Sequence, residues 1–316
     1  MFYNDSPDIC VFYALSPLHA GSGQATGAVD LPIQRERHTL WPQMQASGVK
    51  GAFRHWFHCY HRTNGAQSPD AKEQAKNLTA RVFGSEEGQS DSADGSTNGQ
   101  DSRAGAISVS DARLLAFPVR SNAAPFVWVT CPAVLTRLRR DLRLVALELE
   151  VPILSPGDDD GYLCVCGNIA AAVVLEDLAV SPESPVKDQD HLARIFRTLV
   201  PQVTRLLVIS DRNYSFLSRT ATEIQPQIKI DMETGTAADG SLRYEELLPA
   251  DSVLYSLVFF GQERVLQDPL MTDVIRQHVT KAVSTHIQMG GDMTLGRGLM
   301  EVKWVHRQDL QGGDHE

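Results

Sequence analysis

The sequence predicts an α+β fold in which strands form an antiparallel sheet and helices cover one face of it. Segments with alternating apolar residues indicate strands, amphipathic segments with helical spacing occur between them, and no clean internal repeat is present. The order of strand, helix, further strands, helix and strand is typical of a ferredoxin-like arrangement. At 316 residues, one elaborated domain or two small ones are both possible.

Composition limits the class of protein. The formal net charge of −10 argues against general adhesion to nucleic acid, although a local basic groove remains possible. No apolar run approaches the roughly 20 residues that span a membrane, and the N-terminal residues lack the basic start of a signal peptide. Five cysteines, an odd number, suit a reducing compartment, so we expect a cytoplasmic protein.

The first half of the chain alternates strands and helices. Ser47 is a candidate N-cap for the helix that follows it. Arg137, Arg139, Arg140 and Arg143 form a basic cluster on a later helix, which is either a solvated face or a contact with an RNA backbone or a partner. We expect strands at 9–15, 107–116, 126–130 and 162–166, and helices at 49–62, 70–82 and 132–143.

Residues 84–105 form a polar, acidic, low-complexity insertion. The segment has too few apolar side chains to order itself by burial, so we predict a mobile surface loop.

The second half contains a long polar hairpin at 222–246. Ile224, Ile228 and Ile230 alternate with polar residues, a turn region follows, and Leu242 and Tyr244 continue the alternation. These apolar residues are too few for a core strand, so the hairpin is expected to project from the body. The remaining expected elements are strands at 172–180, 203–209, 252–260 and 299–305, and helices at 190–199 and 268–289.

Two glycine-rich segments stand out. The loop GGDMTLGRG at 290–298 can let a ligand approach the backbone closely, but it lacks the lysine and spacing of a nucleotide P-loop. The other segment, at 21–27, precedes VDLPIQRE at 29–36, which contains the single carboxylate of Asp30. Alone, each segment is equally explained by turn chemistry.

Together these segments resemble a known family. The 290–298 loop resembles the glycine-rich loop of the RAMP superfamily, the RNA-binding proteins of CRISPR systems. The order LHAGSG, VDLPIQRE and GVKGAFR is similar to the Cmr-type repeated backbone subunit of type III-B CRISPR–Cas effector complexes. ISVSDARLLAFPVRS, WVTCPAVLTRL and LRYEELLPADSVLY agree with it, so the resemblance spans nearly the whole chain outside the acidic insertion.

The resemblance implies a single elaborated RAMP domain over 1–316 with a modified RRM-like core. Copies would stack into a filament along a CRISPR guide RNA, together with other subunits of the complex and the complementary target RNA. The 222–246 hairpin would be a thumb that inserts into the guide–target duplex, with Ile228, Ile230, Met232 and Tyr244 as its candidate residues.

The resemblance also implies the catalytic residue. Asp30 falls on the family's catalytic aspartate, as a general base or as a ligand of Mg²⁺ or Mn²⁺. One aspartate cannot chelate a metal alone, so RNA phosphates would supply other ligands. A 2′-OH would then attack the neighbouring phosphate in line. Without the resemblance, Asp30 is better explained as a residue that caps a turn.

The remaining site residues are expected to bind RNA. His19 would position RNA and not act in the chemistry, and the Glu245–Glu246 pair would support the hairpin. Arg35 and Arg37 could hold either RNA or a neighbouring subunit. The expected RNA-binding residues are His19, Gly21, Ser22, Lys50, Arg54, Gly291, Thr294, Gly296 and Arg297.

Three functions remain open at this stage. The first is a metal-dependent endoribonuclease that is active in the assembled complex. The second is a scaffold that binds guide RNA without cutting. The third is a nuclease that processes guide precursors, although such enzymes act alone and lack the VDLPIQRE segment.

Overall fold

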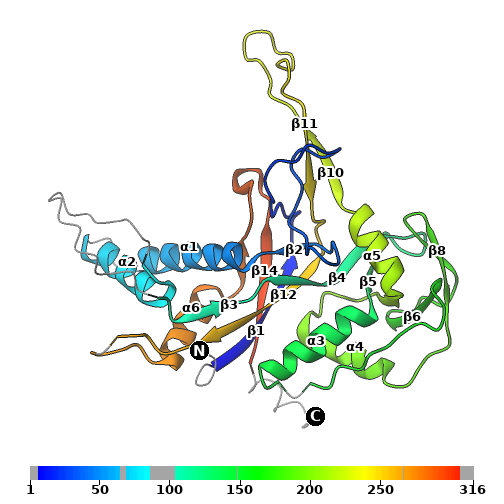
Figure 1. Ribbon diagram of the computed structural model, residues 1–316, viewed down its shortest axis with the longest axis horizontal. Helices are drawn as coiled ribbons and strands as arrows, with labels where there is room; N and C mark the ends of the chain where they lie inside the picture. The colour runs from blue at the N-terminus through cyan, green and yellow to red at the C-terminus, as the bar shows by residue number, and fades with distance from the viewer. Residues whose placement is uncertain (1–5, 65–68, 86–103, 148, 266, 307–316) are drawn as a thin grey trace.

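The computed structural model describes residues 6–64, 69–85, 104–147, 149–265 and 267–306 (Figure 1). Most of the acidic insertion expected at 84–105 lies outside these residues. Only its ends are described, where Gly84 and Ala104 form an antiparallel bridge.

Strands and helices alternate along the described chain. The strands are β1 (Ser6–Ala14), β2 (Gln43–Met44), β3 (Ile107–Val109), β4 (Ala112–Arg120), β5 (Phe126–Thr130), β6 (Gly161–Cys166), β7 (Val173–Leu175), β8 (Leu178–Pro182), β9 (Leu206–Ile209), β10 (Glu223–Gln227), β11 (Arg243–Leu247), β12 (Val253–Phe260), β13 (His286–Gln288) and β14 (Leu299–Val305). The helices are α1 (Ala46–Asn64), α2 (Pro69–Phe83), α3 (Pro132–Leu144), α4 (Gln189–Leu199), α5 (Asp211–Thr220) and α6 (Thr272–Ala282), and η1 (Met293–Leu295) is a 3₁₀ turn.

The sheet is mixed, which corrects the antiparallel expectation. Among the described residues, twelve strands form one sheet in the order β13-β14-β1-β12-β4-β5-β9-β6-β8-β7, with β2 and β3 paired at its side. β5 pairs with β9 in parallel, and β6 pairs with β8 in parallel. The chain from β5 to β9 contains α3 and α4, so it is long enough for the crossover that parallel pairing requires.

Helices cover both faces of the sheet, so the expectation of one covered face is wrong. Phe12 of β1 contacts Phe53 of α1, with ring centroids 6.0 Å apart. Its neighbour Val11 points to the opposite face and pairs with Tyr255 of β12, whose hydroxyl donates to Asp141 of α3 at 2.9 Å. The alternation of buried residues along β1 therefore fills two layers of core.

Two helix boundaries differ from expectation. The N–H of Ala46, at the start of α1, donates to Oδ1 of Asp111 at 2.8 Å, so a distant aspartate caps this helix and Ser47 does not. α6 ends at Ala282, well before the expected Met289. Its expected last turn contains Ile287, which instead pairs with Met300 in β13–β14 and lies fully buried.

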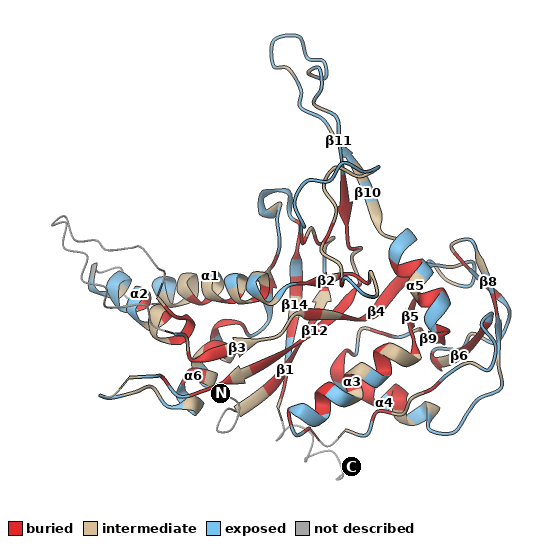
Figure 2. Cartoon of the chain, in the orientation of Figure 1, coloured by how far each residue is buried: buried red, intermediate tan, exposed pale blue. Residues whose placement is uncertain are grey.

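The β10–β11 hairpin projects beyond the strand ends, on the side where β12 begins, between α1 and α2 on one side and α3 to α5 on the other (Figure 1). Most of its outer residues are exposed, and the buried residues gather at its base (Figure 2). The base is therefore where the hairpin is fixed to the body.

Candidate active site and nucleic-acid interface

The segment that contains Asp30 lies along the base of the hairpin. The backbone N–H groups of Asp30 and Leu31 both donate to the Tyr244 carbonyl, at 3.1 and 3.0 Å. The Glu246 N–H donates to the Leu31 carbonyl at 3.0 Å, and Leu31 forms a parallel bridge with Glu245. The polar loop thus ends in a short extended segment held against β11.

Asp30 is partly buried, and one of its two carboxylate oxygens accepts a hydrogen bond. Its Oδ2 accepts the Tyr244 N–H at 2.7 Å, and within the described chain no hydrogen bond to Oδ1 is present. Oδ1 can therefore accept a proton or bind a cation. No group of three His, Cys, Asp or Glu side chains in the described residues could hold a metal ion, so an ion at Asp30 would need further ligands from RNA.

Glu246 of β11 fixes the segment that follows Asp30 to the base of the hairpin. This buried carboxylate accepts Arg35 Nη2 at 2.5 Å, Thr222 Oγ1 at 2.8 Å and the Ile33 N–H at 3.0 Å. Arg35 also donates to the Ser218 carbonyl at the end of α5. Arg35, which the sequence left open between RNA and a neighbouring subunit, is therefore bonded inside the chain.

Arg297 is also bonded inside the chain. Its side chain is buried, and Nη1 donates to Glu245 and to Asp292 Oδ2, the latter at 2.7 Å. Its Nη2 donates to Gln225 Oε1 at 2.8 Å. An RNA contact by this guanidinium stays a prediction, and the structure places the side chain between the glycine-rich loop and the hairpin. The two acidic residues of β11 thus each pair with an arginine, as support of the hairpin requires.

The glycine-rich loop packs on the N-terminal loop through backbone contact. The Gly291 N–H donates to the His19 carbonyl at 2.8 Å. At Gly290, with φ +74°, a Cβ would lie 2.5 Å from the same carbonyl oxygen. Thr294 and Gly296 are exposed at the outer turn, so they remain accessible to a ligand.

His19 lies between the two loops and the hairpin. Its Nδ1 is 2.8 Å from the Glu246 carbonyl oxygen and 3.6 Å from Glu245 Oε1. Because a carbonyl only accepts, Nδ1 carries a proton and donates to the Glu246 carbonyl. A Cβ at Gly21 would lie 2.7 Å from Nε2, so this edge of the ring faces the exposed turn of Gly21 and Ser22.

Lys50 and Arg54 lie one turn apart on α1. Burial, followed by the charge of Arg54, lowers the pKa of Lys50 from its ordinary value. Arg54 Nη1 donates to the Gly84 carbonyl at 2.9 Å. Arg54 also lines a pocket of about 590 Å³ between α1 and α2, and no carboxylate is among the described lining residues, which are Gly51, Arg54, His55, His58, Lys76, Thr79, Ala80 and Ser85.

Three basic side chains of that pocket were missed from the sequence: His55, His58 and Lys76. A signal existed for His58, since Lys50, Arg54 and His58 recur every four residues on one helix face. No such spacing joins Lys76, which comes from α2, to the others.

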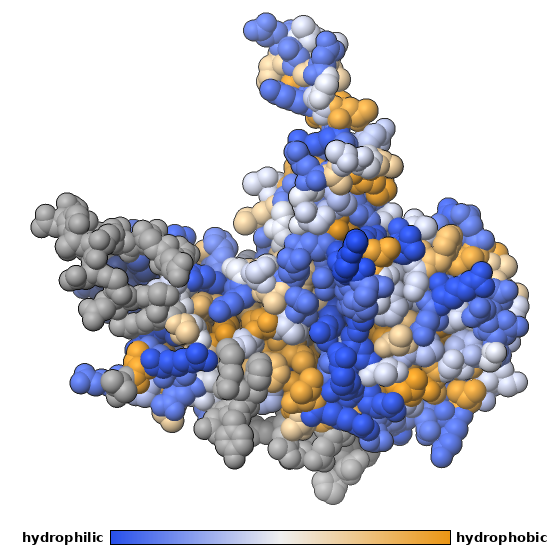
Figure 3. All heavy atoms as spheres, in the orientation of Figure 1, coloured by the Kyte–Doolittle hydropathy of each residue, from blue (hydrophilic) through white to orange (hydrophobic). Residues whose placement is uncertain are grey.

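Several large apolar side chains are exposed on the otherwise polar hairpin. The side chains of Ile228, Ile230 and Tyr244 are 53, 47 and 40% exposed, and Met232 at the tip is 94% exposed. Figure 3 shows hydrophobic and hydrophilic residues mixed along the projection. Exposed apolar side chains on a projection are available for contact with bases or with another protein.

The comparisons with known proteins show the family of this chain. The family model of the RAMP superfamily matches residues 11–301. The chain belongs to the RAMP superfamily. It is also 31% identical to the CRISPR system Cmr endoribonuclease Cmr4 of Pyrococcus furiosus, over 96% of this chain and 97% of that protein. The resemblance to the Cmr-type backbone subunit is thereby confirmed.

Solved structures of RAMP proteins share the fold. A crystal structure of oligomeric Cmr4 from Pyrococcus furiosus superposes with a TM-score of 0.66 at 23% identity, covering 94% of this chain and 97% of that one. A cryo-EM structure of the type III-B Cmr-beta complex bound to cognate target RNA includes a chain with a TM-score of 0.70 at 19% identity, covering 96 and 98%. Within the described residues, no helix is both long and apolar enough to cross a membrane.

Proposed function

We propose that this RAMP protein is the repeated backbone subunit of a cytoplasmic type III-B CRISPR effector complex. It binds the guide RNA as a filament of copies, beside other subunits, and cuts complementary target RNA at regular intervals. The observation that carries the proposal is the position of Asp30, whose Oδ1 makes no hydrogen bond in the described chain at the base of an exposed hairpin. The 31% identity to a Cmr endoribonuclease over almost the whole chain supports it.

The proposed reaction is an in-line attack by a 2′-OH of the target RNA on the adjacent phosphorus. The new O2′–P bond forms as the P–O5′ bond breaks and the departing O5′ takes a proton from water, which leaves a 2′,3′-cyclic phosphate and a 5′-OH. Asp30 takes the 2′-OH proton through Oδ1, while the Tyr244 N–H holds Oδ2. A positioned base of this kind supplies roughly 10²–10⁴-fold in rate.

A divalent cation, Mg²⁺ or Mn²⁺, fits Asp30 in part, because a carboxylate oxygen is the hard ligand these ions prefer. Bound jointly by Asp30 and RNA oxygens, it would stabilise the negative charge that develops on the phosphate. The protein's own contribution is to keep the Asp30 carboxylate in place beside the hairpin.

The RNA contacts are proposed along one side of the hairpin base. Nε2 of His19, the exposed Gly21–Ser22 turn, and the outer turn of Gly291, Thr294 and Gly296 offer polar groups to the backbone. Lys50 and Arg54 add positive charge from α1, and the hairpin residues Ile228, Ile230, Met232 and Tyr244 separate base pairs. The central part of the sheet would serve as a modified RRM-like core.

The second candidate is a guide-RNA scaffold that does not cut. One observation favours it: Asp30 already has a structural role, because its carboxylate caps the Tyr244 N–H. An aspartate with that role alone would be replaceable by asparagine with no loss of activity.

The test compares wild type with Asp30→Asn in the assembled complex, with guide RNA, magnesium and an end-labelled complementary RNA. Asparagine keeps an acceptor for the Tyr244 N–H but is neither a base nor an anionic ligand. We expect a regular ladder of products from wild type, and loss of the ladder with target binding retained in the variant. A ladder that persists in Asp30→Asn would show that Asp30 is not the catalytic residue, and a wild type that binds without cutting would support the scaffold function.

Chelation of divalent ions tests the cofactor. With EDTA in place of magnesium, we expect binding to persist and the ladder to disappear, and manganese to restore it. An unchanged ladder in EDTA would leave Asp30 as a general base without a metal.

A further inference from the structure

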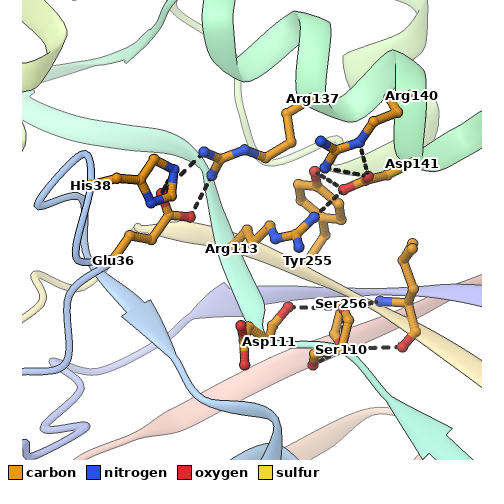
Figure 4. A network of polar contacts seen from close by, with 11 residues as sticks. Glu36, His38, Ser110, Asp111, Arg113, Arg137, Arg140, Asp141, Tyr255 and Ser256 are labelled. Carbon is orange, nitrogen blue, oxygen red and sulfur yellow. Dashed lines mark hydrogen bonds and ion pairs between the residues drawn. The ribbon is translucent and has the colours of Figure 1, made fainter.

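A second polar site lies beside the loop that contains Asp30. It is a pocket of about 300 Å³ between residues 36–43, β4 and α3 (Figure 4). Four arginines line it against two carboxylates, although the net charge of the chain is −10. The described lining residues are Glu36, Arg37, His38, Gln43, Asp111, Arg113, Arg137 and Arg140.

Buried carboxylates fix the inner wall of this arginine pocket. Arg137 donates to both oxygens of Glu36, at 2.5 and 3.0 Å, and its guanidinium lies 5.2 Å from the ring centroid of Trp41. Arg113 Nη1 donates to Asp141 at 2.6 Å. Glu36 and Asp141 are only 7 and 1% exposed. Because these groups are ordered before any ligand binds, little side-chain entropy is lost on binding.

Two arginines at the rim are accessible to a ligand. Arg37 is exposed, and among the described residues no carboxylate pairs with it. The Arg140 side chain is 61% exposed although it pairs with Asp141 at 2.8 Å. Asp111 also lines the pocket, but its Oδ1 accepts the N–H of the first residue of α1, so the helix N-terminus compensates part of its charge. The rim therefore fits an anionic group from outside the chain.

The basic surface continues along α3. A second hollow of about 520 Å³ shares Arg140 with the pocket, and its other described lining residues are Thr136, Arg139, Arg143 and Leu144. Arg143 pairs with Glu150 at 3.1 Å, but both side chains are mostly exposed, so water weakens the pair. The two hollows together offer arginine forks to more than one anionic group. This fits a nucleic-acid strand, in which phosphates recur at regular spacing.

The arginine pocket and α1 lie on opposite sides of the hairpin base. α1, which contains Lys50 and Arg54, lies on one side of the projecting hairpin, and α3 lies on the other (Figure 1). Asp30 is held at the base of the hairpin through its bond to Tyr244. A guide–target duplex has two phosphate backbones, one for each strand. Basic groups on both sides of the hairpin can hold each backbone separately.

We infer that the arginine pocket binds a phosphate of the target strand beside the bond that is cut, through Arg37 and Arg140. This inference rests on the proposed function, in which Asp30 cuts that strand. The pocket begins at Glu36, and the six residues from Asp30 to Glu36 span at most about 20 Å. The strand that reaches Asp30 therefore passes the rim within a few nucleotides. A phosphate fixed there limits the motion of the target backbone, which in-line attack requires.

An acidic segment of another protein is the alternative occupant, because a carboxylate suits the same arginine forks. The continuation of the arginines from the pocket along α3 favours the strand. The short path from the pocket to Asp30 favours it too, since the target strand has to come to that residue.

The experiment removes charge from each side of the contact in the assembled complex. R37Q/R140Q keeps hydrogen-bonding groups at the rim but removes two charges. R194Q/R197Q is the control, since it removes two charges from exposed positions on α4 outside both hollows. Target RNAs carry one uncharged methylphosphonate at successive positions near the cut bond, and guide RNAs carry the same replacement in a parallel series.

We expect R37Q/R140Q to lose about tenfold in affinity for the target, and the control to lose less than about twofold. The slope of target affinity against salt should fall by about one to two. At one or two target positions, a methylphosphonate should cost the wild type about fivefold and R37Q/R140Q almost nothing, because its charge partner is already absent. Methylphosphonates in the guide should affect both proteins equally.

Three results would overturn this inference alone. One is coupling of R37Q/R140Q to guide phosphates. The second is a wild type that binds and cuts its target with no coupling to any target phosphate. The third is loss of copies or other subunits from R37Q/R140Q complexes before target is added, which would show that the pocket binds protein.

Arg37→Gln alone keeps the test decisive if the double variant is unstable, because it breaks no ion pair within the described chain. It should lose about threefold in target affinity and keep the coupling to the same target phosphate. A wild-type complex that binds no complementary RNA contradicts the proposed function itself, and the inference with it.

Discussion

Oδ2 of Asp30 lies 2.7 Å from the backbone nitrogen of Tyr244, so the carboxylate is bonded directly to the strand that leads out of the hairpin. The same tyrosine's carbonyl accepts the N–H groups of Asp30 and Leu31. Three hydrogen bonds therefore set the position of the proposed catalytic group relative to the hairpin, and a displacement of the hairpin base would displace it.

Asp30→Asn and Asp30→Ala should separate this structural role from the chemical one. Asparagine keeps an acceptor for the Tyr244 N–H, whereas alanine leaves that donor without one, at a cost of about 1 kcal/mol. Hydrogen exchange at the Tyr244 amide should be unchanged in Asp30→Asn and faster in Asp30→Ala. Equal exchange in both variants would show that the bond does not fix the loop.

Glu246→Ala should destabilise the hairpin base strongly. Removal of this buried carboxylate leaves the Arg35 guanidinium without its ionic partner, and breaking a buried pair costs about 3–5 kcal/mol. Urea denaturation should show a loss of that order. Glu233→Ala, at the exposed tip of the same hairpin, is the control and should change stability by less than about 0.5 kcal/mol.

Gly298→Ala and Gly296→Ala form a matched pair in the glycine-rich loop. Both glycines have positive φ, +68° and +73°, so both substitutions introduce backbone strain of about 1–2 kcal/mol. A Cβ at Gly298 would also lie 1.8 Å from the Met289 carbonyl oxygen, whereas a Cβ at Gly296 meets nothing within 4 Å. Gly298→Ala should therefore lower the melting temperature well beyond Gly296→Ala. Similar losses would mean that the loop shifts freely to admit the methyl group.

His61 should make stability fall in mild acid. Burial, with the charges of His278 and Lys281 on α6, lowers its pKa to about 4, and its Nε2 is buried without a hydrogen-bond partner. Between an unfolded pKa of about 6.5 and that value, the unfolded chain binds a proton that the folded chain does not, so the free energy of unfolding falls as pH falls. Because the ring is only partly buried, the loss should be about 1–3 kcal/mol.

The measurement is urea denaturation near neutral pH and at about pH 5 for wild type and His61→Gln. Glutamine does not titrate, so the variant should lose less stability between the two conditions. The neighbouring His278, whose pKa burial also lowers, leaves a residual slope in both proteins. Identical slopes would show that His61 is solvated in the folded state.

Local pattern was sufficient for much of the fold. The alternation of Ile224, Ile228 and Ile230 with polar residues indicated an exposed hairpin, and Pro132 marked the first residue of α3. The parallel pairing of β5 with β9 was not predictable in the same way, because it depends on which strands meet across a long crossover. The capping of α1 by Asp111 was missed for the same reason, since the two residues are far apart in sequence.

The site residues also differ in whether local sequence or distant contacts determine their positions. Asp30 was singled out by its resemblance to the family's motif, its role in catalysis stays a prediction, and the structure adds the contacts that hold it. Arg35 and Arg297 are cations next to glycine-rich segments, which made an RNA contact plausible from the sequence. Both are paired instead with β11 carboxylates more than 50 residues away. No short-range spacing distinguishes an arginine that faces solvent from one that faces a distant glutamate.

One measurement tests the central claim most directly. Complexes are assembled from wild-type and Asp30→Asn copies mixed in known proportions, and each band of the target-RNA ladder is quantified alongside target binding. If each copy cuts its own phosphodiester through Asp30, every band weakens in proportion to the share of variant while binding stays constant. If the ladder keeps its full intensity in complexes built only from the variant, Asp30 is not the catalytic residue and the account of this site is wrong.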